Sequence, residues 1–274
     1  MTDPFAASRL DGKIALVTGA AQGIGESAAR LLAARGAAGI VLVDRNRERG
    51  EAVAADLAAA GTPAVFVHAD LAVPAEVDAV VPAAQKAFGR LDILANVAGI
   101  TDRGTILDTD LALFDRMFAV NVRAPFFLMQ GALRLMLEAG TGGTVVNVLS
   151  MNAHVGSPNL TPYSASKGAL LNLTKNVAHS VNANRIRVNG IALGWVDTPG
   201  EHETLKKFHG AGPDWLAAAE ASQPFGRLIK TDDVARVIAF LASAESAPMT
   251  GAVIDYEQRV FGASGAPLGY PRPA

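Results

Sequence analysis

The stretch Val17-Thr18-Gly19-Ala20-Ala21-Gln22-Gly23-Ile24-Gly25 decides the fold that this sequence predicts. A short β-rich run ends in it, and a helical pattern begins there. Glycines let the backbone turn tightly and approach a pyrophosphate, to which the N-terminus of the helix offers free N–H groups and positive dipole charge. Gly23, Gly25 and Ala28 also fit the G-x-G-x-x-A form of the dinucleotide fingerprint. We expect a dinucleotide to bind here; an ordinary glycine-rich connection between strand and helix is the alternative.

Short apolar runs alternate with longer helical patterns along the chain. Strands are predicted at residues 13–18, 39–44, 64–68, 91–96, 144–149, 185–191 and near 252–255. Helices are predicted at residues 24–35, 47–60, 74–88, 111–138, 162–183, 201–208, 214–222 and 232–242. This order predicts an α/β fold: a single doubly wound Rossmann domain, its parallel sheet of about seven strands covered by helices on both faces. Gly36, Gly61 and Gly89 each follow a helix, where a left-handed cap belongs.

Length and composition fit one domain. The chain has 274 residues, half of them apolar, and a single α/β domain runs to about 250 residues. We expect the domain at residues 11–261, with a substrate lid at about 194–225, an N-terminal arm at 1–10 and a C-terminal tail at 262–274. The absence of cysteine excludes disulfides, thiolate metal ligands and thiol nucleophiles.

The charge and hydropathy patterns predict no nucleic-acid binding and no membrane span. The net charge is −2 with scattered Lys and Arg, whereas nucleic-acid binding needs a basic face. No apolar run reaches the roughly 18 residues of a spanning helix, and no signal peptide is evident, so we expect a cytoplasmic protein. His202 and His209 have no carboxylate set around them, and we expect no metal site.

Asp44 bears on the choice of dinucleotide. It lies 19 positions after Gly25, at the end of the second predicted strand. A carboxylate there can accept both adenosine-ribose hydroxyls and would repel a 2′-phosphate, so the sequence favours NAD over NADP as cofactor. Two alternatives stay open: Asp44 also precedes a helix and could cap it, and the neighbouring Arg45 could hold a phosphate.

Tyr163 and Lys167 are the first candidates for chemistry. Pro162 marks the first turn of a predicted helix, and Tyr163 and Lys167, four residues apart, share one face of that helix. A free phenol has a pKa near ~10, and a nearby ammonium lowers it. Such a phenol can take a proton from an alcohol or return one to a carbonyl. The same spacing is also common on exposed helices without any function.

Ser150 and Asn121 complete the candidate set. Ser150 ends a predicted strand 13 residues before Tyr163, where it can hydrogen-bond the reacting oxygen or simply cap the next turn. Pro125 has no N–H for the carbonyl four residues back, which is that of Asn121. We therefore expect a kink at Asn121, with its main-chain oxygen free to hold water. A proline at the junction of two ordinary helices is the alternative.

In combination these residues resemble the classical short-chain dehydrogenases/reductases, from about residue 13 to residue 255. The motif Thr18-Gly19-x-x-x-Gly23-x-Gly25 matches the family's cofactor turn, and Asp70-Leu71 looks like its adenine-contacting pair. Asn96-Val97-Ala98-Gly99 is similar to its N-N-A-G element, with Val97 in place of the second asparagine. The catalytic tetrad matches in order and approximate spacing: Asn121, Ser150, Tyr163 and Lys167.

The resemblance implies that the chain moves a hydride between a nicotinamide cofactor and a secondary alcohol or ketone. It makes Tyr163 the general acid/base and Lys167 the residue that lowers its pKa and binds the nicotinamide ribose. Ser150 would orient the substrate oxygen, and Asn121 would anchor a water in a proton relay. The implied cofactor-binding residues are Gly19, Gln22, Gly23, Ile24, Gly25, Asp44, Asp70, Leu71, Asn96, Ala98, Gly99, Tyr163, Lys167, Val196 and Thr198.

The segment Leu193-Gly194-Trp195-Val196-Asp197-Thr198 departs from the family, which has Pro-Gly-x-x-x-Thr at this point. We expect the later Pro199-Gly200 to supply the rigid point instead. Several polar groups near one carbonyl suit a sugar or polyol, and the lid and the ending Val253-Ile254-Asp255-Tyr256-Glu257 look similar to sugar and polyol dehydrogenases of the family. The candidate substrate residues are Ser150, Asn152, His154, Tyr163, Gly194, Trp195 and His202.

Two other functions remain open, and the resemblance also implies an assembly. A 3-oxoacyl thioester (acyl carrier protein) reductase or other carbonyl reductase usually works with NADPH, and Asp44 argues against it. A non-enzymatic dinucleotide sensor would not need Ser150, Tyr163 and Lys167. The assembly implied is a homotetramer, paired through the helices at 111–138 and 162–183 and through the edge strand near Ala252. The segment after Asp255, with Arg259 and Phe261, would reach a neighbouring subunit or be a disordered end.

Overall fold

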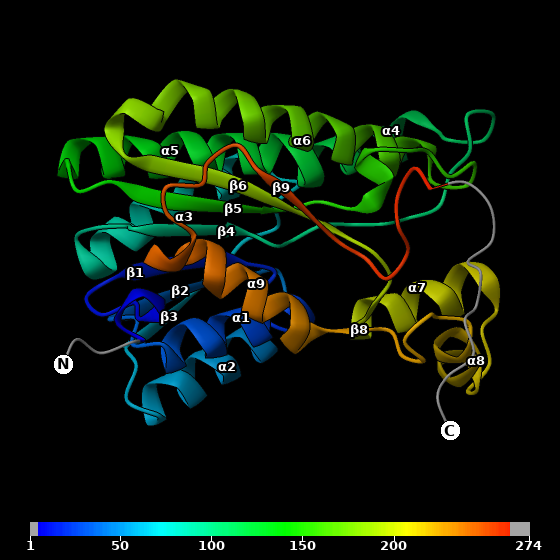
Figure 1. Cartoon of the computed structure of the whole chain (residues 1–274), viewed down its shortest axis with the longest axis horizontal. Helices are drawn as coiled ribbons and strands as arrows, with labels where there is room; N and C mark the ends of the chain where they lie inside the picture. Colours follow the sequence, from blue (N-terminus) through cyan, green and yellow to red (C-terminus); the bar gives the residue numbers. More distant parts are fainter. Residues whose placement is uncertain (1–4, 264–274) are drawn as a thin grey trace.

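A seven-stranded parallel sheet forms the centre of the molecule (Figure 1). The computed structural model describes residues 5–263. The strand order is β3-β2-β1-β4-β5-β6-β9, and every pair is parallel. The strands are β1 (Ile14–Thr18), β2 (Gly39–Asp44), β3 (Ala64–His68), β4 (Ile93–Asn96), β5 (Gly143–Val148), β6 (Ile186–Leu193) and β9 (Val253–Tyr256). The predicted doubly wound fold is confirmed.

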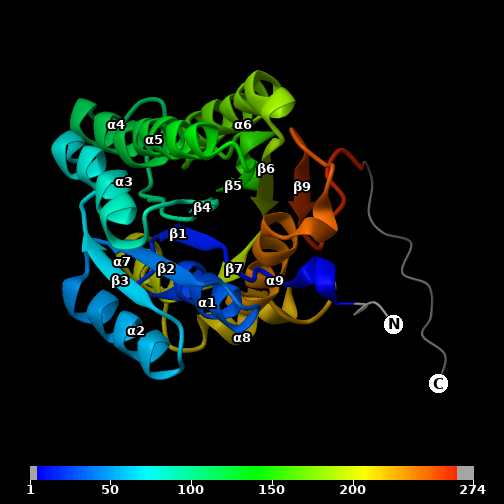
Figure 2. The same ribbon diagram turned by 90° about the vertical axis from the view of Figure 1, so that its left-hand side faces the viewer.

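Helices cover both faces of the sheet, and Figure 2 shows the two layers edge-on. One layer consists of α1 (Gly23–Ala34), α2 (Arg47–Ala59) and α9 (Thr231–Ala242). The other consists of α3 (Pro74–Phe88), α4 (Leu111–Phe118), α5 (Ala124–Ala139) and α6 (Thr161–Val181). In β1, Ala15 and Val17 pack into the first layer, while Ile14 and Leu16 pack into the second. This alternation has the two-residue period of a strand buried on both faces.

The topology creates a crevice between the ends of β1 and β4. The chain runs outward from β1 to β3 and then crosses back to β4 on the other side of β1. In open α/β sheets, ligands bind outside the carboxyl ends of the strands at such a reversal. Positive φ angles at Gly36, Gly61 and Gly89 confirm the predicted left-handed caps.

The predicted helix at 111–138 is interrupted. The helix α4 ends at Phe118, a π-helical turn spans Ala119–Arg123, and α5 follows. The amide of Ala124 donates to the carbonyl of Ala119, five residues back, and Pro125 has no N–H to give. The interruption therefore falls at Asn121, where the proline predicts a kink.

The lid consists of two short helices at the carboxyl ends of the strands (Figure 1): α7 (Pro199–His209) and α8 (Trp215–Ala221). A second, two-stranded parallel sheet joins β7 (Val196–Asp197) to β8 (Ile229–Lys230) and anchors the lid to the body. These two strands were not predicted, because two residues carry no readable period. None of the helices among residues 5–263 is long and apolar enough to cross a membrane.

The chain ends are only partly described. Leu10, in the expected N-terminal arm, is buried in the core, and residues 1–4 lie outside the described residues. Of the expected tail at 262–274, only Gly262 and Ala263 belong to the described residues.

Candidate active site

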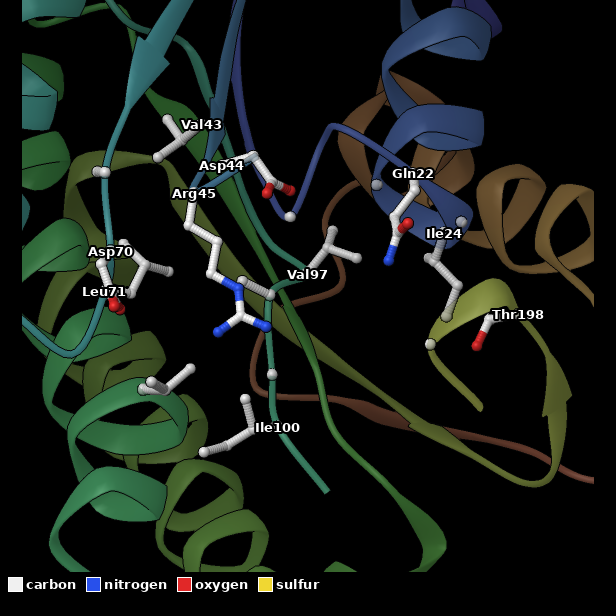
Figure 3. A pocket seen from close by; sticks show the side chains of 18 of the residues that line it. Gln22, Ile24, Val43, Asp44, Arg45, Asp70, Leu71, Val97, Ile100 and Thr198 are labelled. Atoms are coloured by element: carbon white, nitrogen blue, oxygen red, sulfur yellow. The ribbon is translucent and has the colours of Figure 1, made fainter. Parts of the chain in front are cut away.

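A cleft opens at the crevice between the ends of β1 and β4 (Figure 3). Most of the predicted cofactor residues line it: Gly19, Gln22, Gly23, Ile24, Gly25, Asp44, Asp70, Leu71, Ala98, Gly99 and Thr198. Arg45, Val97, Ile100 and Arg116 also line it. Four of the predicted cofactor residues do not line the cleft: Asn96, Val196, Tyr163 and Lys167. The structure therefore brings together residues from the ends of β1, β2, β3 and β4.

The glycine turn has the backbone that the fingerprint predicts. Gly19 and Gly23 have positive φ angles of 68° and 60°. A Cβ on Gly25 would lie 2.1 Å from the Gly19 carbonyl oxygen, and one on Gly19 would lie 3.0 Å from the Cα of Ala98. The helix α1 begins at Gly23 with no side-chain cap from Gln22, so its first N–H groups face the cleft. This cradle fits a pyrophosphate.

Asp44 is held by the backbone at the end of β2. Its carboxylate accepts hydrogen bonds from the amides of Ala21, at 3.1 Å, and Asn46, at 2.9 Å. The cap of α2 is Asn46, which accepts from the amide of Arg49, so the alternative role of Asp44 as that cap is excluded. Arg45 extends its guanidinium into the same cleft in Figure 3. A carboxylate and a guanidinium therefore stand side by side where the adenosine half of a dinucleotide would lie.

Two buried polar residues support the cleft from behind. The Thr18 hydroxyl accepts hydrogen bonds from the amides of Val97, at 3.0 Å, and Ala98, at 3.1 Å, and so fastens the end of β1 to the segment after β4. Asn96 is 2% exposed and donates to Asn147 in the neighbouring strand, so it lies in the core and not at the cleft surface. Sequence reasoning quoted Thr18 only as part of a motif and missed this role.

Tyr163 and Lys167 lie on one face of α6 and are both buried. The Lys167 Nζ donates to the Val148 carbonyl at 2.9 Å and lies 5.9 Å from the centre of the Tyr163 ring. Burial lowers the pKa of Lys167 to about 8. A Cβ on Gly99 would lie 3.3 Å from both the Lys167 Nζ and the Asn121 Oδ1, which places this ammonium beside the cofactor cleft.

The pKa of Tyr163 is raised above that of a free phenol. Burial is the largest cause, and the hydrogen bond with Ser150 acts in the opposite direction. Among charged groups, Glu201 raises this pKa and Arg103 lowers it. We expected Lys167 to lower the pKa of Tyr163. The pKa is raised instead, because burial of the phenol outweighs the lowering by Ser150 and Arg103. A neutral phenol at neutral pH is suited to donate a proton to a carbonyl.

Asn121 connects three elements through its side chain. Its Nδ2 donates to the Ile100 carbonyl and to the Ser166 hydroxyl, both at 3.0 Å, and its Oδ1 accepts from the Ile100 amide at 3.0 Å. The fully buried side chain thus joins the π-helical turn to α6 and to the cleft wall. Sequence reasoning considered only its main-chain oxygen.

The candidate substrate residues are spread along the outer rim. His154 is bonded to Asp255 at 2.9 Å and packs against the Phe261 ring. Asn152 accepts from Ser157, and Gly194 leaves room for Glu257. His202 is bonded to Asp197 at 2.7 Å, and its ring lies edge-on to Trp215. His154 and His202 therefore each interact with a carboxylate of the protein and would have to give up this partner to bind a substrate.

The lid carries a charged group that sequence reasoning did not assign. The Trp195 indole donates to Glu201 at 3.0 Å, and the Arg103 guanidinium lies 3.9 Å from the same carboxylate oxygen. Thr198 caps α7 through its hydroxyl, and Pro199 begins that helix and lines the cleft. Arg103 lies in a loop without periodicity or motif, and no sequence signal pointed to it.

The comparisons with known proteins agree with this geometry. The family model described as enoyl-(acyl carrier protein) reductase matches residues 19–257. Galactitol 2-dehydrogenase of Agrobacterium fabrum is 37% identical over 87% of this chain and 93% of its own length. Cis-4-hydroxycyclohexanecarboxylate dehydrogenase of Sinomonas cyclohexanicum is 38% identical over 88% of this chain and 94% of its own.

A solved structure extends the agreement to the fold. The short-chain type dehydrogenase/reductase from Mycobacterium marinum superimposes with a TM-score of 0.83 at 31% identity, covering 92% of this chain and 96% of that one. Proteins of this kind use NAD(H) or NADP(H), and the glycine turn and crevice described above fit such a cofactor. The chain belongs to the classical short-chain dehydrogenases/reductases and is an oxidoreductase that acts on CH–OH groups.

Proposed function

We propose that the chain is an NAD-dependent dehydrogenase that interconverts a secondary alcohol and its ketone, with a sugar or polyol as substrate. The observation that carries this proposal is the arrangement around Gly99, which has the ammonium of Lys167 and the amide of Asn121 on one side and the cofactor cleft on the other. Tyr163 and Ser150 lie on the same side as Lys167, at the ends of α6 and β5.

Each residue of the tetrad has a defined task in this proposal. A nicotinamide cofactor, when bound in the cleft, would supply or accept the hydride. Tyr163 gives its proton to the carbonyl oxygen in reduction and takes it back in oxidation, while Ser150 holds that oxygen beside it. Lys167, with a pKa of about 8, is mostly protonated at pH 7 and can replace the proton that Tyr163 loses. Asn121 fixes the relative positions of α6 and the cleft wall through its hydrogen bonds to Ile100 and Ser166.

The preference for NAD rests on Asp44. Its two oxygens are fixed by backbone amides, so the carboxylate cannot turn away from an incoming 2′-phosphate without breaking them. Arg45 works in the opposite direction, because its guanidinium would attract that phosphate. Initial rates with NAD and NADP on one alcohol test the preference, and a higher kcat/KM with NADP would contradict it.

The sugar or polyol assignment rests on the lid and on one relative. The lid offers Trp195 and Glu201, and one relative is a galactitol 2-dehydrogenase. The description of the matching family model favours a second candidate, a reductase of acyl carrier protein thioesters. A panel of polyols, sugars, hydroxy acids and 3-oxo esters, followed by cofactor absorbance, decides between them. Turnover of 3-oxo esters alone would overturn the polyol assignment.

We also propose a homotetramer. Phe114, Phe126 and Phe127 are each about two-fifths exposed along α4 and α5, the helices through which the family resemblance implies subunit pairing. The sheet ends at β9, whose free edge could pair with a second copy. Light scattering on the purified protein tests this, and a monomer at micromolar concentration would contradict it. The expected cytoplasmic location stays a prediction.

A further inference from the structure

The loop after β4 and the lid helix α7 are in contact through charged side chains. Gly104 forms a β-bridge with Leu160, and its carbonyl accepts from the amide of Thr161 at the start of α6. Arg103, the residue before Gly104, is therefore held close to the beginning of the helix that carries Tyr163. Glu201 approaches from the first turn of α7. The amide of Glu201 donates to the hydroxyl of Thr198, which lines the cofactor cleft, so Glu201 lies at the border between the lid and that cleft.

The two charged side chains are largely buried but loosely paired. The Arg103 side chain is 16% exposed and that of Glu201 is 18% exposed. Arg103 also donates to the Thr101 carbonyl at 2.7 Å and to the His209 ring at 3.1 Å, which fixes its guanidinium plane. The closest approach of the two charges, 3.9 Å, is longer than a hydrogen bond of about 2.7–3.2 Å. A hydroxyl oxygen can lie about 2.8 Å from both atoms, accepting from Arg103 and donating to Glu201.

An aromatic wall borders the pair. The Trp195 indole N–H fixes one oxygen of Glu201, and the Trp195 ring stacks on Trp215 with centroids 6.1 Å apart. Among the described residues, the other Glu201 oxygen, Oε2, receives no hydrogen bond. A fixed acceptor, a fixed donor and an aromatic surface are what a neutral polyhydroxylated molecule needs. An anionic substrate would meet the Glu201 carboxylate in the same place.

We propose that Arg103 and Glu201 determine substrate specificity by binding a second hydroxyl group of the substrate while Tyr163 acts on the first. The inference rests on the proposed function, since it concerns the same site. It assigns Arg103 and Glu201 to substrate recognition and restricts the substrate class to neutral alcohols with at least two hydroxyls. A site built to hydrogen-bond a hydroxyl discriminates strongly against the analogue that lacks it.

The first test compares two alcohols that differ in one hydroxyl, cis-1,2-cyclohexanediol and cyclohexanol. The wild-type protein should oxidise the diol with a kcat/KM at least tenfold higher. Glu201→Gln and Arg103→Met should bring this ratio to within threefold. Glu203→Gln, on the exposed side of the same helix, is the matched control and should keep the ratio. Equal kcat/KM for the two alcohols in the wild-type protein would overturn the inference.

A lid variant separates recognition from simple closure. Lys207 joins the lid to Asp102 by an exposed ion pair at 3.0 Å. Lys207→Met loosens the lid without touching Arg103 or Glu201, so it should change KM for both alcohols by the same factor. If Lys207→Met abolished the discrimination as fully as Glu201→Gln, the pair would only hold the lid, and the inference would be wrong.

The second test does not need turnover. The chain has two tryptophans, Trp195 and Trp215, and both lie in this group, so selectively excited tryptophan fluorescence reports on it alone. With ADP-ribose present, the diol should change the emission saturably in the wild-type protein and in Glu203→Gln, but not in Glu201→Gln. Cis-4-hydroxycyclohexanecarboxylate is the anionic comparison. Tighter binding of this anion than of the diol, lost in Arg103→Met, would overturn the inference.

The two tests also separate this inference from the proposed function. A saturable, Glu201-dependent fluorescence response without any cofactor reduction would sustain the inference and contradict the dehydrogenase assignment. Oxidation of both alcohols at equal kcat/KM, without a fluorescence response, would contradict the inference and sustain the dehydrogenase assignment.

Discussion

The cofactor half and the substrate half of the site are built in different ways. The cofactor half consists of strand ends and backbone: glycines without room for a side chain, and a threonine hydroxyl that fastens β1 to the segment after β4. The substrate half consists of long charged and aromatic side chains from a loop and a lid. The first half tolerates almost no change at its glycines, whereas the second can exchange partners. We expect the first to define the reaction and the second to define the substrate.

The largest effect is expected where the halves meet. Tyr163→Phe removes the proton donor, so kcat should fall about 1000-fold, within the range for a lost general acid or base. The measurement is kcat with NAD on the best alcohol of the panel. Tyr256→Phe, outside the cofactor cleft, is the matched control and should keep kcat. Retention of more than a tenth of kcat in Tyr163→Phe would mean that the proton comes from another group.

Gly25→Ala tests the cofactor half alone. The added methyl would lie 2.1 Å from the Gly19 carbonyl oxygen, which forces the turn apart. We expect the Kd for NAD, measured by calorimetry, to rise about 100-fold, which is about 2.7 kcal/mol. The fluorescence response to the diol should remain. Gly156→Ala, where a Cβ has open space, should leave the Kd unchanged. An unaltered Kd in Gly25→Ala would break the distinction between the two halves.

Lys167→Met should gain stability while losing activity. Burial lowers the pKa of Lys167 to about 8, so its charge destabilises the folded state by about 3 kcal/mol at pH 7. Loss of its hydrogen bond to Val148 offsets about 1 kcal/mol, which leaves a gain of about 2 kcal/mol. The cost is fully present below pH 8 and disappears toward pH 10.5, so wild-type stability should rise through that window.

Urea unfolding at pH 7 and at pH 10 measures this change. The advantage of Lys167→Met over the wild-type protein should be larger at pH 7. Lys175→Met changes an exposed lysine of the same helix and should alter the free energy of unfolding little at either pH. A variant less stable than the wild-type protein at pH 7 would show that the buried ammonium is fully compensated.

The smallest effect concerns the choice of cofactor. Asp44→Ala removes the charge that repels a 2′-phosphate, so the ratio of kcat/KM with NADP to that with NAD should rise about tenfold, or about 1.4 kcal/mol. Arg45→Ala should move the ratio the other way. The KM for the alcohol should stay the same in both variants, because both positions belong to the cofactor half. An unchanged ratio in Asp44→Ala would leave the NAD preference unexplained.

Predictability from the sequence follows the same division. The strands, the parallel sheet and the glycine turn follow from the alternation of short apolar runs with helical patterns and from the glycine motif, both of which are local properties of the chain. Asn96 was placed at the cofactor by resemblance, but its side chain lies in the core, because a strand alternates its faces and no motif states which face is meant. Tyr163 was expected to have a lowered pKa, and only its burial reveals the opposite.

The sequence predicts the position of the lid but not its contacts with the rest of the molecule. The sequence indicates its helices approximately, yet β7 and β8 are two residues long and carry no period. Arg103 reaches Glu201 across 98 positions of sequence, through a loop whose course depends on the bridge between Gly104 and Leu160. Such contacts join segments that are far apart in the sequence, so no local sequence pattern predicts them.

The π-helical turn at Ala119–Arg123 has a consequence for how this chain can vary in length. Successive residues of an α-helix are rotated by about 100° and rise by about 1.5 Å. Deleting one residue from the turn would convert its i→i+5 bonds to i→i+4 bonds and leave α4 and α5 nearly in phase, but it would rotate side chains within the turn by roughly that angle. The Asn121 side chain would then lose its hydrogen bonds to Ile100 and to Ser166 at the same time. The count of residues between α4 and α5 should therefore be as intolerant of change as the identity of the asparagine itself.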